Sequence, residues 1–151
     1  MKIREATEKD TDIIMGFWIK SIKDAKNFDK DFNAGKPAHL LKRIYSKYFK
    51  GCKYFLAEED GKIVGFVAGK IEKKPGFYIE REICNLFQIF VEKEYRNKGI
   101  GTELIKTFIR WGKTKGARTI KLQVYGKNTN AIKAYRKIGF KELKIEMRKK
   151  I

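Results

Sequence analysis

Residues 90–108, FVEKEYRNKGIGTELIKTF, run from an apolar strand end through a basic, glycine-rich turn into a helix. Two glycines, Gly99 and Gly101, stand where that helix is expected to begin. A helix start leaves its first backbone N–H groups unpaired and carries partial positive charge, so such a turn is typical of an anion-binding site. The residues that would form the site are Arg96, Asn97, Lys98, Gly99, Ile100, Gly101 and Thr102.

Two well-known phosphate-binding turns fit this stretch poorly. A dinucleotide-binding turn has a third glycine and an acidic residue about 20 positions later. This chain has Leu104 at the third position, and Lys121 and Gln123 in the later window. A Walker A loop ends in Gly-Lys-Ser/Thr, whereas Gly101 is followed directly by a threonine. The turn therefore indicates another anionic ligand.

The segments around the turn predict an α/β fold with a central mixed sheet. Apolar residues at helical spacing predict helices at 8–25, 38–49, 101–116 and 128–138. Alternating or β-rich runs predict strands at 2–7, 53–58, 62–71, 82–91, 119–125 and 140–147. An Asp-Gly pair at 60–61 indicates a hairpin, and the helix after residue 91 indicates a parallel crossover. We expect one domain, residues 1–151, in the order β-α-α-β-β-β-α-β-α-β, with helices on both faces of the sheet.

Composition and charge limit the kinds of protein that this chain can be. A chain of 151 residues with 42% hydrophobic content is long and apolar enough to bury a single hydrophobic core. No apolar run approaches the ~20 residues of a membrane helix, and the N-terminal segment lacks the apolar block of a signal peptide, so we expect a cytoplasmic protein without membrane contact. Cys52, Cys84 and His39 are too few for a zinc tetrad, and no metal is expected. The net charge of +18 would attract nucleic acid or a polyanionic small molecule, but its spread along the chain does not choose between them.

A second motif follows the turn, with a predicted strand between the two. Residues 128–140 read NTNAIKAYRKIGF, which has the pattern N-x-x-A-x-x-x-Y-x-x-x-G-F. Together with the R-x-x-G-x-G turn at 96–101, it resembles the two signatures of the GCN5-related N-acetyltransferases (the GNAT family), which bind acetyl-CoA. The resemblance is strongest over residues 82–140. It implies an acyl-CoA N-acyltransferase fold and the transfer of an acetyl group from acetyl-CoA to a primary amine.

The resemblance also implies roles for individual residues. The turn at 96–102 would hold the pyrophosphate, Asn128 would hydrogen-bond the cofactor, and Tyr135 would donate a proton to the departing sulfur. Main-chain groups of a strand end would hold the pantetheine arm and polarise the thioester carbonyl; these belong to Ile89, Phe90 and Val91. From the residues alone, Asn128 is equally a good helix N-cap and Tyr135 a packed helix aromatic.

The general base is the point at which this chain departs from some relatives. Family members with a glutamate base carry it at the position of Asn85, and an amide does not serve as a base. Glu82, on the same strand, is the candidate base through a water, and the alternative is an amine that reaches the site already deprotonated.

The acceptor is left open between a peptide N-terminus, a lysine and a small-molecule amine, although the positive charge disfavours polycationic amines at long range. A homodimer and contact with nucleic acid or the ribosome stay open as further partners. The alternative function is a basic protein associated with nucleic acid or the ribosome on the same fold.

Overall fold

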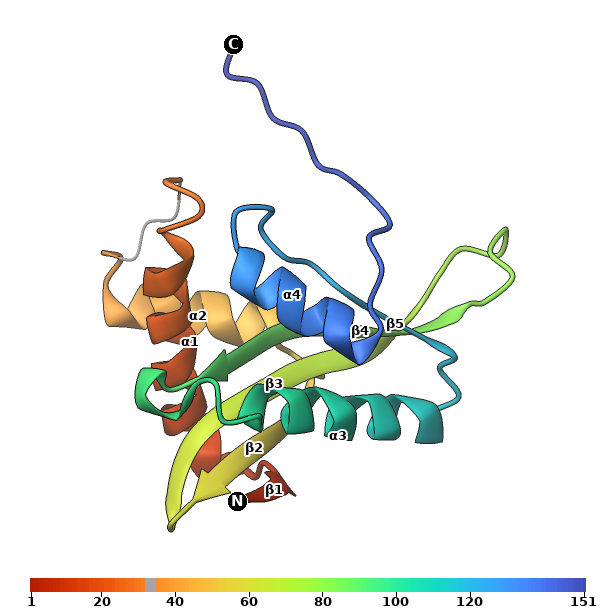
Figure 1. Cartoon of the computed structure of the whole chain (residues 1–151). Coiled ribbons are helices and arrows are strands. Elements are labelled where there is room, and N and C mark those ends of the chain that lie inside the picture. The colour runs from red at the N-terminus through yellow and green to blue at the C-terminus, as the bar shows by residue number, and fades with distance from the viewer. Residues whose placement is uncertain (32–34) are drawn as a thin grey trace.

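The structure is a computed structural model that describes residues 1–31 and 35–151 (Figure 1). Its centre is a single five-stranded sheet whose strands lie side by side in chain order. They are β1 (Lys2–Glu5), β2 (Lys53–Glu59), β3 (Lys62–Lys73), β4 (Glu82–Val91) and β5 (Thr119–Leu122). Neighbouring strands are antiparallel except for β4 and β5, which are parallel. The predicted mixed sheet is therefore confirmed.

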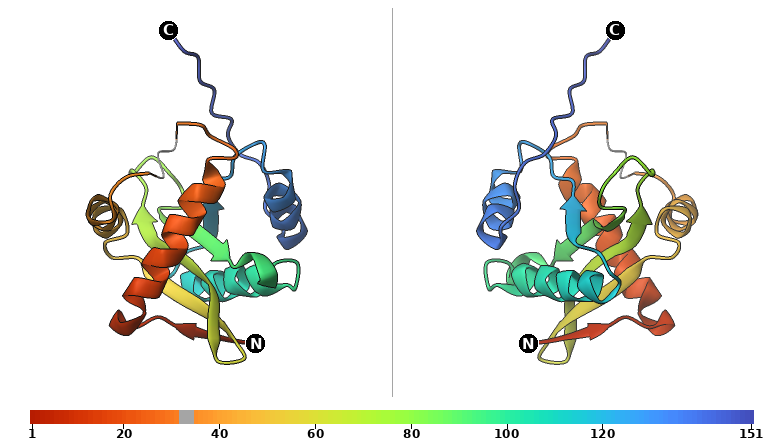
Figure 2. Two further views of the ribbon diagram at one scale, coloured as in Figure 1. Left: turned by 90° about the vertical axis from the view of Figure 1, so that its left-hand side faces the viewer. Right: turned by 90° about the vertical axis from the view of Figure 1, so that its right-hand side faces the viewer.

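Helices cover both faces of the sheet, as the sequence predicts (Figure 2). One face carries α1 (Thr11–Ala25) and α2 (Ala38–Tyr48), and the other carries α3 (Ile100–Thr114) and α4 (Thr129–Ile138). Short 3-10 helices, η1 (Glu8–Asp10) and η2 (Lys93–Tyr95), precede α1 and α3. The core is divided accordingly, because Phe66 packs under α1 while Phe108 of α3 packs on the opposite face. Among the described residues, no helix is both long and apolar enough to span a bilayer.

A β-bulge in the centre of the sheet shifts the register of β3 against β4. Ala68 pairs with Gln88, but the next residue, Gly69, pairs with Leu86, so Phe87 is an extra residue in β4. A Cβ at Gly69 would lie 2.1 Å from the carbonyl oxygen of Asn85, so only glycine fits at this crossing of the two backbones. The bulge lies where β4 leaves β5, and it therefore shapes the region described below.

The predicted last strand at 140–147 is wrong. Beyond α4 the chain runs as an extended arm (residues 140–151) away from the body, and no strand of the described chain pairs with it (Figure 1). Its apolar side chains Leu143, Ile145 and Met147 are 92%, 88% and 89% exposed. An alternating pattern sets the two faces of an extended segment, but a strand also needs a neighbouring edge with which to hydrogen-bond. Arg148 of the arm pairs with Asp29 at 2.8 Å and with Asp31 at 3.4 Å, and Glu142 pairs with Arg136 of α4.

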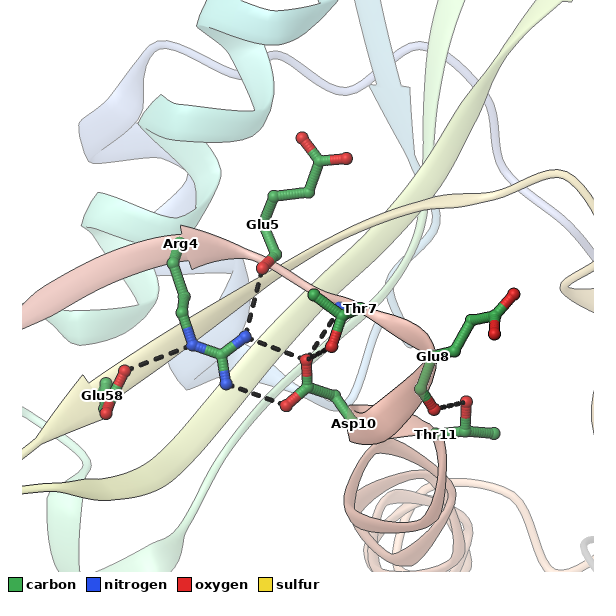
Figure 3. Close-up of polar contacts among 7 residues, drawn as sticks. All are labelled: Arg4, Glu5, Thr7, Glu8, Asp10, Thr11 and Glu58. Carbon is green, nitrogen blue, oxygen red and sulfur yellow. Dashed lines mark hydrogen bonds and ion pairs between the residues drawn. The ribbon is translucent and has the colours of Figure 1, made fainter.

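An ion pair joins the first strand to the start of α1 (Figure 3). The Arg4 guanidinium binds both carboxylate oxygens of Asp10 at 2.8 and 2.9 Å, and the Thr7 N–H donates to the same carboxylate at 2.7 Å. Asp10 is only 6% exposed. Hydrogen bonds from Arg4 and from Thr7 hold the pKa of Asp10 well below its ordinary value.

Candidate active site

Strand β4 continues past its parallel neighbour and leaves part of its edge open. Pairing with β5 runs from Ile83 to Leu86, and residues 87–91 of β4, which we call the open edge, have β3 as their only neighbouring strand among the described residues. The carbonyl oxygen of Phe90 faces β3, where a Cβ at Gly65 would lie 2.6 Å from it. Since main-chain groups of successive strand residues point to opposite sides, Ile89 and Val91 direct theirs toward the open edge.

The glycine-rich turn begins where the open edge finishes. Gly99 has a left-handed φ of 80° and caps the N-terminus of α3, and Asn97 before it also has a positive φ, 63°. The Glu103 N–H donates to the Gly99 carbonyl at 3.1 Å. The N–H groups of Ile100, Gly101 and Thr102 precede that bond, so the helix itself gives them no acceptor. The turn thus presents consecutive amides at the positive end of the α3 dipole.

Gly101 is not explained by the fold. Its φ is not positive, and a Cβ there would have Ile89 and Val91 as its nearest neighbours, each at 3.9 Å. Glycine in a helix is destabilising by roughly 0.5–1 kcal/mol relative to alanine. Because nothing in the protein demands glycine here, the residue leaves space for a group that approaches the backbone from outside.

Arg96 fixes the turn in place. Its Nε donates to the Val91 carbonyl at 2.8 Å, and its Nη2 pairs with Asp24 of α1 at 2.7 Å. The guanidinium also lies 5.6 Å from the centre of the Phe90 ring. Lys98 is engaged less strongly, with its Nζ 5.1 Å from the Tyr95 ring. Arg96 is therefore a brace for the turn, and Lys98 is the freer source of positive charge.

Helix α4 supplies the two residues of the second motif. The Asn128 side chain accepts a hydrogen bond from the Ala131 N–H at 3.2 Å, so it caps the helix. Tyr135 packs on the α3 face of the sheet, with its ring 5.8 Å from Phe140. Burial raises the pKa of Tyr135, so the phenol is protonated at neutral pH.

The two candidate positions for a base lie on opposite faces of β4. Cys84 faces α3, since a Cβ at Gly112 would lie 2.7 Å from its Sγ. By alternation Glu82 shares that face, and Asn85 lies on the face of α1 and α2. The structure therefore separates Glu82 from the position that carries the base in some relatives.

A carboxylate that the sequence motifs do not reveal lies against Asn85. Glu72 of β3 accepts a hydrogen bond from Asn85 Nδ2 at 2.8 Å and pairs with Lys121 of β5 at 3.2 Å. Asn85 is 9% exposed, whereas the Glu72 side chain is 30% exposed. Burial raises the pKa of Glu72, but the hydrogen bonds from Asn85 and Lys121 outweigh burial, and the pKa is lowered overall. Glu72 is thus ionised at neutral pH.

Comparison with known proteins assigns the chain to one family. The Acetyltransferase (GNAT) family matches residues 21–140. An uncharacterized N-acetyltransferase of Methanocaldococcus jannaschii is 32% identical over 95% of this chain, which spans 62% of that relative's length. The described residues contain no group of three or more His, Cys, Asp or Glu side chains arranged to hold a metal.

Solved structures show the same fold at low sequence identity. The BH1408 protein from Bacillus halodurans, solved as a tetramutant, superimposes with a TM-score of 0.86 at 21% identity, over 100% of both chains. The aminoglycoside N-acetyltransferase AAC(6')-Iy, in complex with CoA, superimposes with a TM-score of 0.71 at 22% identity, over 99% of this chain and 93% of that one.

Proposed function

The chain belongs to the acetyltransferase (GNAT) family, and we propose that it is an N-acetyltransferase that moves an acetyl group from acetyl-CoA to a primary amine. One observation carries this proposal: the open edge of β4 runs directly into a turn that presents amides at a helix start. Acetyl-CoA has two corresponding parts, an amide-bearing pantetheine arm and a pyrophosphate. The site matches both in the order in which the cosubstrate joins them.

The turn would hold the pyrophosphate. The amides of Ile100, Gly101 and Thr102 point out of the start of α3, and the absence of a Cβ at Gly101 lets phosphate oxygens approach the backbone. Asn97 and Gly99 supply the left-handed conformations that turn these amides to one side, as in other anion-binding nests. Lys98 adds charge, and Arg96 keeps the turn against β4.

The open edge would hold the pantetheine arm as an added strand. Ile89 and Val91 direct main-chain groups toward it, and an N–H on this edge polarises the thioester carbonyl as the oxyanion develops. The Phe90 main chain faces β3, so Phe90 contributes its ring to the core below α1. Asn128 caps α4 through its carbonyl oxygen, which leaves its NH₂ group to donate to the cosubstrate.

The chemistry is the aminolysis of a thioester. A neutral amine attacks the carbonyl carbon, a tetrahedral oxyanion forms, and the C–S bond breaks. Tyr135 donates its proton to the leaving sulfur, and its raised pKa keeps that proton in place until the thiolate forms. No observation on the site or its relatives supports the alternative nucleic-acid role.

The acceptor class follows from charge and needs a direct test. A chain of net charge +18 repels polycations at long range, which favours a peptide N-terminus, a lysine on an anionic assembly or a small amine with its own carboxylate. A panel of such amines, with aminoglycosides included, is assayed for release of CoA thiol from acetyl-CoA. The proposal would be overturned if none of the amines on the panel caused release of CoA thiol and the protein did not bind CoA.

Tyr135→Phe tests the acid role. We expect kcat to fall by about 10²-fold, the lower range for general acid catalysis, while the Kd for CoA stays near the parental value. Tyr78→Phe is the matched control, since Tyr78 lies on the exposed β3–β4 connection and is expected to leave both quantities unchanged. Parental turnover in Tyr135→Phe would remove this residue from the acid role.

A further inference from the structure

We propose that Glu72 receives the acceptor amine and takes its proton, and so supplies from β3 the carboxylate that β4 lacks at Asn85. This inference rests on the proposed acetyl transfer and names the base for it. No motif points to Glu72, because it lies outside both signatures.

Glu72 lies near the end of the open edge at which β4 pairs with β5 again. The phosphate end of acetyl-CoA would be held beyond Val91, so its thioester end lies at the other limit of the open edge, where β4 rejoins β5 at Leu86. Asn85 directly precedes Leu86, and its side chain lies on the face of α1 and α2. Glu72, hydrogen-bonded to Asn85 at 2.8 Å, therefore stands beside the thioester end.

The two oxygens of the Glu72 carboxylate have different surroundings. Oε2 takes the hydrogen bond from Asn85 Nδ2 at 2.8 Å and the Lys121 ammonium at 3.2 Å. Lys70 Nζ lies 3.9 Å from Oε1, which is beyond hydrogen-bond distance. Among the described residues Oε1 thus keeps its lone pairs for a ligand, and the 30% exposure of the side chain lets that ligand enter.

The charged and titratable groups around Glu72 come from two strands and the turn before β2. Lys70 of β3 and Lys121 of β5 stabilise the carboxylate, and Cys52 faces it with a thiol whose pKa burial raises to about 11. With its pKa raised, Cys52 is neutral at neutral pH. Glu72 is therefore the group on this face that accepts a proton at neutral pH, and Asn85 and Lys121 are positioning residues.

The proton balance is complete without another reactant. The acceptor enters as an ammonium ion, and Glu72 Oε1 takes one N–H proton, directly or through one water. The nitrogen lone pair then forms the N–C bond and the tetrahedral oxyanion, and when this collapses the C–S bond breaks and the sulfur takes the Tyr135 proton. The tetrahedral nitrogen loses a second proton, which restores Tyr135, and Glu72 returns its proton to solvent.

Glu72→Gln tests the proposal, because glutamine keeps the shape and still accepts from Asn85. We expect kcat/KM for the amine to fall by about 10²–10⁴-fold at pH 7, with the Kd for CoA unchanged. The deficit should shrink as the pH rises toward the pKa of the acceptor, where the amine is neutral before it binds. Glu59→Gln, at the far end of β2, is the control and should match the parent.

A second variant separates catalysis from structure. Adding Asn85→Asp to Glu72→Gln returns a carboxylate to the same face from β4, and we expect at least tenfold recovery of kcat/KM. Glu82→Gln tests the rival base and should leave activity within a few fold of the parent, because Glu82 lies on the α3 face. Parental kcat/KM in Glu72→Gln, or loss of CoA binding with no recovery in the double variant, would overturn the role of Glu72. Failure of the parent itself to acetylate any amine would instead overturn the proposed function.

Discussion

Replacing Gly101 with glutamate should separate the stability of the fold from the binding of acetyl-CoA. The fold has room for the side chain, because the nearest atoms to a Cβ there lie 3.9 Å away. Glutamate is more stable than glycine in a helix by roughly 0.5–1 kcal/mol. A negative charge in the first turn adds about 0.3–1 kcal/mol through the helix dipole. The variant without ligand should therefore be about 1 kcal/mol more stable, and its Tm should rise by about 2–4 °C.

The same side chain should nearly abolish the effect of the ligand. A ligand at 100 times its Kd stabilises the native state by about 2.7 kcal/mol, which corresponds to a Tm increase of roughly 5–10 °C for a chain of this size. In Gly101→Glu the carboxylate occupies the space of the phosphate and repels it. A hundredfold weaker Kd leaves about 0.4 kcal/mol at the same concentration, or a shift of about 1 °C.

Thermal unfolding with and without CoA measures both quantities in one experiment. Gly16→Glu is the matched control, since Gly16 lies within α1, a Cβ there would have no atom within 4 Å, and the substitution gives the same change of charge. The control should gain stability and keep the full shift with CoA. A parental shift in Gly101→Glu would show that the turn does not hold the phosphates. A lower Tm of this variant without ligand would show that the fold has no room for the side chain.

Three further predictions concern the scaffold. Asp10→Asn should lower the free energy of unfolding by about 2 kcal/mol at pH 7, because it removes a charged hydrogen-bond acceptor. The lowered pKa of Asp10 means that this stability is present above its ordinary pKa of 3.8 and is lost as the pH falls below it. In urea unfolding, the free energies of unfolding of parent and variant should therefore differ less at pH 3 than at pH 7. Gly112→Ala should destabilise by about 1–3 kcal/mol through its clash with Cys84, and adding Cys84→Ala should recover most of that loss in thermal unfolding, whereas additive effects would contradict the clash. Brief trypsin treatment should cut the arm at 140–151 first and leave a product with parental Tm and CoA binding; a protected arm would show that it has a partner.

The glycine-rich turn could be predicted because its chemistry is local. Gly99 and the α3 start are adjacent in sequence, and the left-handed conformation at Gly99 is one that glycine adopts readily. Glu72 could not be found in the same way, because its neighbours are set by register. The bulge makes Ala68 pair with Gln88 and Gly69 with Leu86, so a count that starts at Gly65 and Val91 and ignores the bulge would pair Asn85 with Ile71 instead of Lys70.

The arm shows that a local sequence pattern can also predict a strand that does not form. Residues 140–147 alternate like a strand, but they form no strand. Strand β5 stops at Leu122 instead of the predicted residue 125, and no described strand adds to its far edge. Local alternation encodes which side chains share a face, and it does not encode which edge, if any, lies alongside.

The two faces of the sheet give the proposed acid and base opposite protonation states at one pH. Tyr135 lies among apolar side chains on the α3 face, where burial raises its pKa and keeps the proton that the sulfur will need. Glu72 lies on the α1 face with Lys121 and Asn85, which outweigh its burial and keep it ionised. Because β4 separates the two side chains, neither shifts the pKa of the other, and each keeps the protonation state set by its own surroundings. In the proposed reaction Glu72 therefore takes the first proton of the amine on the α1 face, and Tyr135 supplies the proton of the departing sulfur on the α3 face.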